Sequence, residues 1–160
     1  MDPVTTRPVR RPTVRLLATV VAVVALATAL AGCGASATPS ASLGPIELNG
    51  TNWLLVSYLS PTGTSYTVPS AVTPGATFQD GQFSANTGCN TAGGPYTQDG
   101  TSIAIGPVSS TKMACQEPMA TVELAYLAAI SVVDTAVGND KTLILRQSDG
   151  FTALEFVRGN

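Results

Sequence analysis

The longest apolar run of the chain lies near its N-terminus. Residues 16–30 (LLATVVAVVALATAL) carry no charge and follow a segment that contains four arginines. As a helix, such a run would be roughly 22 Å long, shorter than the ~30 Å hydrocarbon core of a membrane. A basic segment, an apolar core and small residues after it are typical of a secretory signal peptide, so we predict one over residues 1–32. An uncleaved membrane anchor is the alternative interpretation.

Beyond residue 45, apolar and polar positions alternate in short runs. Asp-Gly pairs at 80–81, 99–100 and 149–150 separate several of these runs, which predicts β-hairpins with type I′ turns. We therefore expect strands near 51–59, 76–79, 82–86, 101–105, 142–147 and 151–158, with weaker ones near 65–68, 107–111 and 135–137.

Residues 118–133 depart from this alternation and indicate a helix. Pro118 suits the first helical turn, where its missing N–H has no intrahelical partner to lose. The segment contains no glycine and no internal proline. The expected fold is α+β, a strongly bent antiparallel sheet or partly closed barrel with one packed α-helix. The apolar side chains that recur at helical spacing are Met119, Val122, Tyr126, Ile130 and Val133, with Leu127 beside them.

Charge divides the chain into a basic leader and an acidic remainder. From Cys33 onward there are four basic and nine acidic residues, a net charge of 4 − 9 = −5. This balance disfavours a nucleic-acid partner, because phosphates require a basic surface. Residues 34–45 (GASATPSASLGP) have no charge and little apolar surface, so we expect a flexible tether over 33–45 and a folded domain over 46–160.

The chain contains no histidine. Catalysis by Ser-His-Asp or Cys-His sets is therefore excluded, as are the usual zinc sites. Ser109 and Lys112 fit the S-x-x-K pattern, but that mechanism places both residues on one helical turn, and a strand or loop is expected here. We predict no enzymatic activity, no metal and no cofactor.

Leu30-Ala31-Gly32-Cys33 resembles the lipobox of bacterial lipoproteins. The resemblance implies a lipid on the Cys33 sulfur, cleavage before Cys33, and anchorage on the extracytoplasmic face of the cell membrane or outer membrane. Cys89 and Cys115 would then be an even pair in an oxidising compartment, which predicts a disulfide between them. A redox or nucleophilic cysteine is disfavoured, because there is no C-x-x-C motif and no histidine to activate a thiolate.

Several distinctive motifs lie between residues 47 and 158. They are Leu48-Asn49-Gly50-Thr51-Asn52-Trp53, Gly88-Cys89-Asn90 with Gly94 and Tyr96, Thr111-Lys112-Met113-Ala114-Cys115, Met119 with Glu123, and Leu143, Leu145 and Phe156. In order and spacing these motifs resemble the META domain of HslJ-like bacterial lipoproteins. That family is associated with heat-shock and virulence settings and has no established reaction, so the resemblance implies an architecture rather than a mechanism.

Five residues of these motifs are candidates for a functional or structural role: Trp53, Asn90, Thr111, Met113 and Glu123. We expect Trp53 in the core and Asn90 at a tight turn. Glu123 is expected to accept hydrogen bonds from the backbone, Thr111 or Asn90. A catalytic role is disfavoured because no second acid stands at a defined spacing.

Three functions compete at this point. The first is an envelope lipoprotein that supports stress tolerance by contacting an envelope protein, and a flat exposed apolar patch would favour it. The second is a small-ligand or peptide binder, favoured by an apolar cleft of a few hundred Å³. The third is an enzyme that works without histidine, which two perturbed carboxylates in one cleft would favour.

Overall fold

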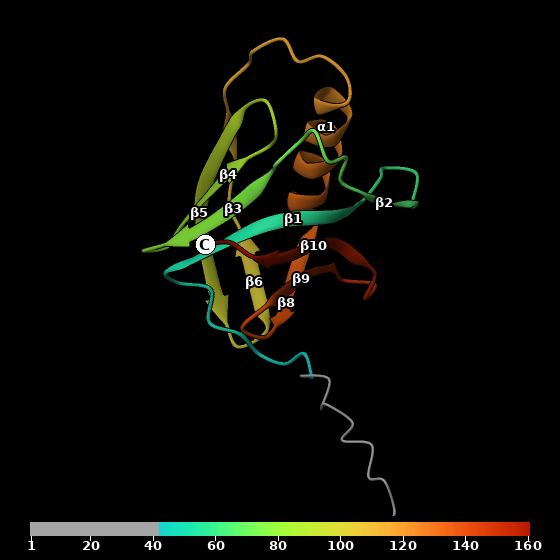
Figure 1. Cartoon of the computed structure of the whole chain (residues 1–160). Helices are drawn as coiled ribbons and strands as arrows, with labels where there is room; N and C mark the ends of the chain where they lie inside the picture. The colour runs from blue at the N-terminus through green and yellow to red at the C-terminus, as the bar shows by residue number, and fades with distance from the viewer. Residues whose placement is uncertain (1–41) are drawn as a thin grey trace, which may run out of the picture. The chain divides into compact units, whose positions relative to one another are not determined.

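The computed structural model describes residues 42–160; the predicted leader, Cys33 and the first part of the predicted tether lie outside the described residues. For these described residues, Figure 1 shows strands wrapping around a common interior with an α-helix beside them. The elements are β1 (Thr51–Leu59), β2 (Ser65–Thr67), β3 (Gly75–Gln79), β4 (Gln82–Asn86), β5 (Thr91–Asp99), β6 (Ser102–Ile105), β7 (Ser109–Ser110), α1 (Met119–Ile130), β8 (Val133–Gly138), β9 (Thr142–Gln147) and β10 (Thr152–Arg158).

Eight of these strands form a closed antiparallel barrel. Hydrogen bonding follows the order β10-β9-β8-β6-β5-β4-β3-β1, and β10 pairs with β1 to complete the circle. That closing pair extends from Trp53 opposite Arg158 to Tyr58 opposite Leu154. The predicted α+β fold, an antiparallel sheet with one packed helix, is confirmed, but the barrel is closed rather than partly closed. The short strands β2 and β7 attach to the outside of this circle, at β1 and β5.

The strand missing from the sequence prediction is β5. Its centre is Gly93-Gly94-Pro95, a composition that disfavours strands. The glycines are explained by crowding: a Cβ on Gly94 would lie 2.5 Å from the Pro107 carbonyl oxygen, and one on Gly93 would lie 3.0 Å from that of Phe83. Because β5 pairs with both β4 and β6, the predicted set of strands lacked the link between these two strands.

Only the first of the three Asp-Gly pairs has the predicted turn. Asp80 and Gly81 both have positive φ, 51° and 74°, as a type I′ turn requires. At the other two pairs only the glycine is left-handed, with φ of 57° at Gly100 and 85° at Gly150. The Gly100 pattern fits a type II′ turn, and Gly150 lies in the connection between β9 and β10.

Helix α1 packs its buried side against the barrel. Val122, Tyr126 and Ile130 are buried as predicted, whereas Val133 lies beyond the helix and opens β8. The Tyr126 hydroxyl donates to the Gly75 carbonyl at 3.1 Å, so the helix is bonded to β3. The helix has 12 residues, and nothing helical within residues 42–160 is long and apolar enough to cross a membrane.

Aromatic side chains fill the barrel interior. Trp53 lies in this core, as expected, and its Nε1 donates to the Thr51 hydroxyl at 2.7 Å. The Phe78 ring lies 5.4 Å from that of Phe83 and 5.1 Å from that of Tyr96. These contacts bury large apolar areas and satisfy the one polar atom of the indole ring, which is the usual arrangement of a stable core.

Candidate functional site

Residues from three separate motifs meet where the loop after β4, the segment before α1 and α1 itself come together. We call this cluster the motif junction: Cys89, Asn90, Thr111, Met113, Cys115 and Glu123.

Asn90 is the centre of the motif junction, and it is only 3% exposed. Its Oδ1 accepts hydrogen bonds from the Thr111 hydroxyl at 2.7 Å and the Met113 N–H at 2.8 Å. Its Nδ2 donates to both carboxylate oxygens of Glu123, at 3.0 and 2.9 Å, and to the Met113 carbonyl at 3.2 Å. Every polar atom of this buried amide therefore has a partner, and several of those bonds join segments far apart in the sequence.

The predicted role of Asn90 in a tight turn needs a correction. The turn exists, but Thr87 holds it: the Thr87 hydroxyl donates to the Asn90 carbonyl at 2.8 Å and accepts the Asn90 N–H at 3.1 Å. The Asn90 side chain is not needed to hold the turn. It forms hydrogen bonds with the segment before α1 and with α1 itself. The bond from Asn90 to Glu123 was among the expected alternatives, whereas the bonds that Asn90 accepts from Thr111 and Met113 were not predicted.

Cys89 and Cys115 are joined by a disulfide. The Cys115 sulfur also lies 3.1 Å from Glu123 Oε2, a contact without a hydrogen bond, since a disulfide sulfur carries no proton. The sulfur atoms of both cysteines and a Glu123 oxygen lie within 4.8 Å of one another. Thiolates, not disulfides, are the sulfur ligands of metals, so this donor set does not suit a metal ion.

The Glu123 carboxylate is engaged on both oxygens. Of the donors expected from the sequence, Asn90 is the one that reaches it, while Thr111 bonds Asn90 instead. Above the junction is a shallow depression of about 450 Å³ lined in part by Met113, Leu124 and Leu127. The chemistry available is that of a structural acceptor, because no described residue pairs with Glu123 as a second acid or as a nucleophile.

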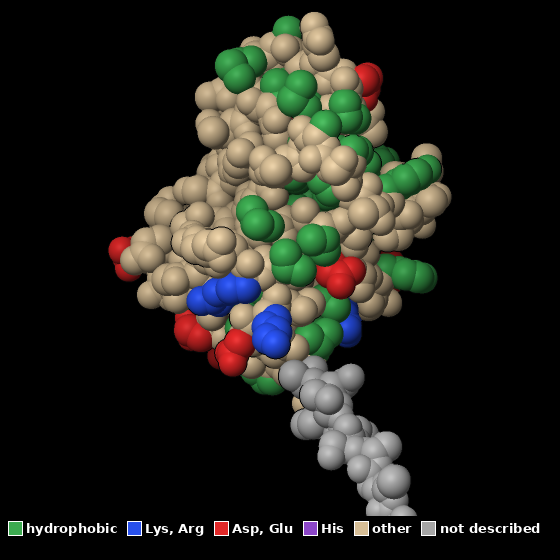
Figure 2. All heavy atoms as spheres, viewed as in Figure 1, with side chains coloured by type: hydrophobic (Ala, Val, Ile, Leu, Met, Phe, Trp, Pro, Cys, Tyr) green, Lys and Arg blue, Asp and Glu red, His purple; other side chains and the backbone are tan. Residues whose placement is uncertain are grey.

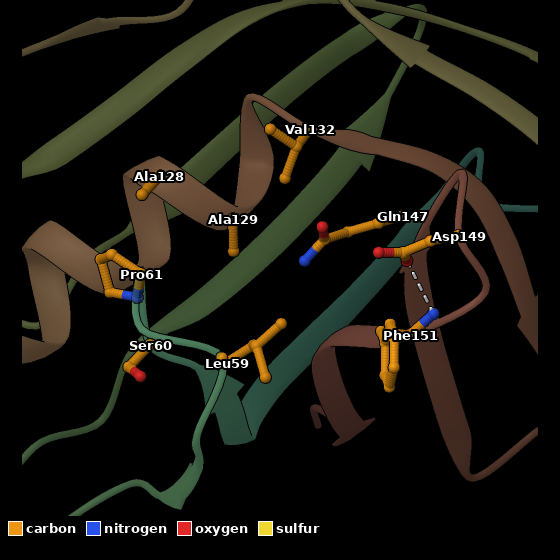
Figure 3. A pocket seen from close by; sticks show the side chains of 10 residues that line it. Leu59, Ser60, Pro61, Ala128, Ala129, Val132, Gln147, Asp149 and Phe151 are labelled. Atoms are coloured by element: carbon orange, nitrogen blue, oxygen red, sulfur yellow. Dashed lines mark hydrogen bonds between the residues drawn. The ribbon is translucent and has the colours of Figure 1, made fainter.

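A separate concave site lies at the C-terminal end of α1. We call it the helix-end cleft; it holds about 430 Å³ between the segments 59–63, 128–132 and 147–151. Figure 3 shows its walls, built from the β1–β2 loop, the last turn of α1 and the β9–β10 turn. None of these residues was predicted as a site candidate from the sequence. The one signal was Phe151, an aromatic residue directly after the Asp149-Gly150 turn.

The walls of the helix-end cleft are mostly apolar, with a few polar groups among them. Phe151 is 67% exposed and Val132 is 50% exposed. Figure 3 shows the Gln147 amide extending toward the space between Leu59 and Ala129. Apolar walls with a small number of polar groups are the usual composition of a ligand site, and cleft volumes of this order are typical of one.

Charge and titration add to the description of the surface. Figure 2 shows lysine and arginine side chains gathered in the lower part of one face, while hydrophobic side chains surface in its upper part.

Burial raises the pKa of Tyr96, with a smaller contribution from the carboxylates of Glu47 and Asp80. Burial also raises the pKa of Tyr126 strongly. Neither tyrosine belongs to the motif junction or the helix-end cleft, so these shifts reflect packing.

Comparison with known proteins places the chain in a family. A protein from Burkholderia xenovorans, solved by NMR, is 29% identical, with a TM-score of 0.59 over 71% of this chain and 84% of that one. A DUF4847 family protein from Bacteroides vulgatus is 16% identical, with a TM-score of 0.49 over 70% and 94% of the two chains. No curated protein matches significantly. The model of the META domain matches residues 46–159, and the chain therefore belongs to the META domain family.

Proposed function

We propose that the chain is a lipid-anchored, non-enzymatic lipoprotein of the cell envelope, whose META domain acts by contacting another protein. One observation carries the proposal. The residues that define the family motifs bond one another in the motif junction, whereas the exposed apolar side chains Leu124, Val132 and Phe151 are left outside it. Val132 and Phe151 line one cleft, and contiguous exposed apolar surface commonly serves as an interaction site.

The absence of catalytic activity is supported by the chemistry of the available groups. The chain has no histidine, and its two described cysteines are in a disulfide. Both oxygens of Glu123 are held by Asn90. General acid–base and nucleophilic mechanisms need a reactive group within reach of a partner and of the substrate. No described side chain combines those features.

The envelope address is supported by the lipobox-like sequence that ends at Cys33 and by the uncharged segment after it. Gly44, within that segment, exchanges two backbone hydrogen bonds with Gly138 at 3.0 and 2.8 Å, so the described chain enters the domain beside β8. From Gly44 back to Cys33 there are 44 − 33 = 11 residues, a reach of at most about 40 Å. A lipid on Cys33 would hold the domain within that distance of the membrane.

Metabolic labelling tests the address. The full chain is expressed in a bacterial host supplied with an alkyne fatty acid, beside Cys33→Ala and the tether control Ser36→Ala. We expect label on the wild type and on Ser36→Ala, and none on Cys33→Ala, which should also retain its leader. Label on Cys33→Ala, or an unlabelled wild type, would contradict the proposed anchor.

A second candidate function is small-ligand or peptide binding, and the helix-end cleft favours it. Photo-crosslinking in intact cells separates the two candidates, with the crosslinker placed at position 124, outside the cleft, or at position 151, on its wall. A specific protein adduct is expected under the main proposal. Adducts with small molecules alone would favour the second candidate. If a partner is found, loss of stress tolerance in cells lacking the chain should be restored by the wild type and not by Cys33→Ala.

A further inference from the structure

We propose that the helix-end cleft binds a peptide segment in which an apolar side chain stands next to a lysine or arginine. The inference rests on the proposed function, action through protein contact, and names the chemistry of the segment that is contacted.

The apolar part of the assignment comes from the cleft walls. Val132 from the end of α1 and Phe151 from the β9–β10 turn are both at least half exposed and face a common space. Ala129 and Leu59 form the rest of that apolar surface. An apolar side chain placed there would remove the Phe151 ring and the Val132 methyl groups from water, which is the main favourable term in association.

The peptide part of the assignment comes from Gln147. Its side-chain amide is half-buried, extends into the cleft and forms no hydrogen bond within residues 42–160. A primary amide offers two N–H donors and one carbonyl acceptor. The N–H and C=O of a peptide backbone complement these groups, whereas a purely apolar ligand would bury the amide without partners, at a free-energy cost.

The basic part of the assignment comes from Asp149. Its Oδ1 accepts the Phe151 N–H at 3.0 Å, which holds the carboxylate at the edge of the cleft, as Figure 3 shows. No lysine or arginine lines the cleft, and the domain as a whole carries nine acidic and four basic residues. A cationic side chain on the ligand would meet a complementary charge there, and an acidic one would be repelled.

Synthetic peptides test the assignment directly. The mature lipidated chain is placed in nanodiscs of neutral lipid, with empty nanodiscs as the blank, and binding is followed by biolayer interferometry. The probes are acetyl-Gly-Leu-Leu-Lys-Gly-amide and two relatives, one with Glu in place of Lys and one with Ser-Ser in place of Leu-Leu. We expect the first to bind, the Glu peptide to bind at least tenfold more weakly, and the Ser-Ser peptide not to bind.

Variants locate the binding. Phe151→Ser should weaken the Leu-Leu-Lys peptide at least tenfold, and Asp149→Asn, which retains the acceptor for the Phe151 N–H, should abolish the preference for Lys over Glu. Leu54→Ser is the matched control, because Leu54 is an apolar side chain on β1 that is 47% exposed and lies outside the cleft; it should bind like the wild type. Circular dichroism of each variant verifies that it is folded.

The outcomes separate this inference from the proposed function. Equal binding of all three peptides, or binding unaffected by Phe151→Ser, would overturn the inference. So would a lack of peptide binding by a chain that crosslinks to an envelope protein through position 124, a result that leaves the proposed function standing. If the wild type carries no fatty-acid label, the peptides are tested on the chain in buffer without nanodiscs, and selective binding there would support the cleft while contradicting the lipid anchor on Cys33.

Discussion

The motif junction and the helix-end cleft differ in how their polar and apolar groups are used. In the junction, Asn90 is buried and each polar atom of its side chain is bonded. In the cleft, Phe151 is mostly exposed and the Gln147 amide has no partner within the described residues. Satisfied buried networks stabilise a unique fold, whereas unsatisfied groups beside apolar surface are available to a ligand. The buried amide at the centre of the family motifs thus has no polar atom left for a ligand.

Removal of the disulfide should have the largest effect on stability. In the double variant Cys89→Ala/Cys115→Ala, the loss of a cross-link between residues 26 apart should lower the free energy of unfolding by about 3–4 kcal/mol. Urea denaturation measures the loss, and wild type with reductant is the control. Non-reducing mass mapping should first show a single Cys89–Cys115 peptide pair. Full alkylation of both cysteines without reductant would contradict the junction as described.

Asn90→Ala should have the second-largest effect and lower the free energy of unfolding by about 2–3 kcal/mol. The substitution leaves the Met113 N–H and the Glu123 carboxylate without their partner. Phe151→Ser is the comparison from the other region. Its ring is exposed, so the free energy of unfolding should change by less than about 0.5 kcal/mol. The contrast between the two regions would fail if both variants were equally destabilised.

Substitutions of Glu123 test the structural role of the motif junction further, because they distinguish the charge of this side chain from its size and its hydrogen-bond acceptors. Glu123→Gln keeps one acceptor oxygen for the Asn90 amide and should cost little. Glu123→Leu removes both acceptors and should destabilise the domain by about 1–3 kcal/mol. Thermal unfolding, measured beside complementation of envelope stress, distinguishes structure from chemistry. A Gln variant that is as stable as wild type and yet inactive would show that Glu123 serves a functional site.

The free energy of unfolding at alkaline pH tests a third contact, the one between Tyr126 of α1 and the barrel. The unfolded chain releases the Tyr126 proton above pH 10, while burial raises the pKa of Tyr126 in the folded domain, which keeps its proton. The unfolded state then binds fewer protons, so the contribution of Tyr126 to the free energy of unfolding is constant below pH 10 and falls above it, by about 1.4 kcal/mol per pH unit. Tyr126→Phe should flatten this decline, and Glu123→Gln should leave it unchanged. An unchanged slope in the Phe variant would contradict the assignment.

Much of the barrel was predictable because its hairpins alternate apolar and polar residues around Asp-Gly turns. Strand β5 was not, since Gly93, Gly94 and Pro95 are explained only by the approach of neighbouring chains at Phe83 and Pro107. The bond between Asn90 and Glu123 was among the expected alternatives. The helix-end cleft could not be predicted, because its walls come from three segments distant in sequence, and none carries a motif.

The most direct test of the motif junction as a structural unit is a double-mutant cycle between Asn90 and Glu123, which lie 33 residues apart in the sequence. The free energy of unfolding is measured for Asn90→Ala, Glu123→Leu and the double variant. If the two side chains stabilise the fold through each other, their losses will not add, and the coupling will be about 1–2 kcal/mol, within the range for bonded partners. Strictly additive losses, with no coupling between the two substitutions, would contradict the account.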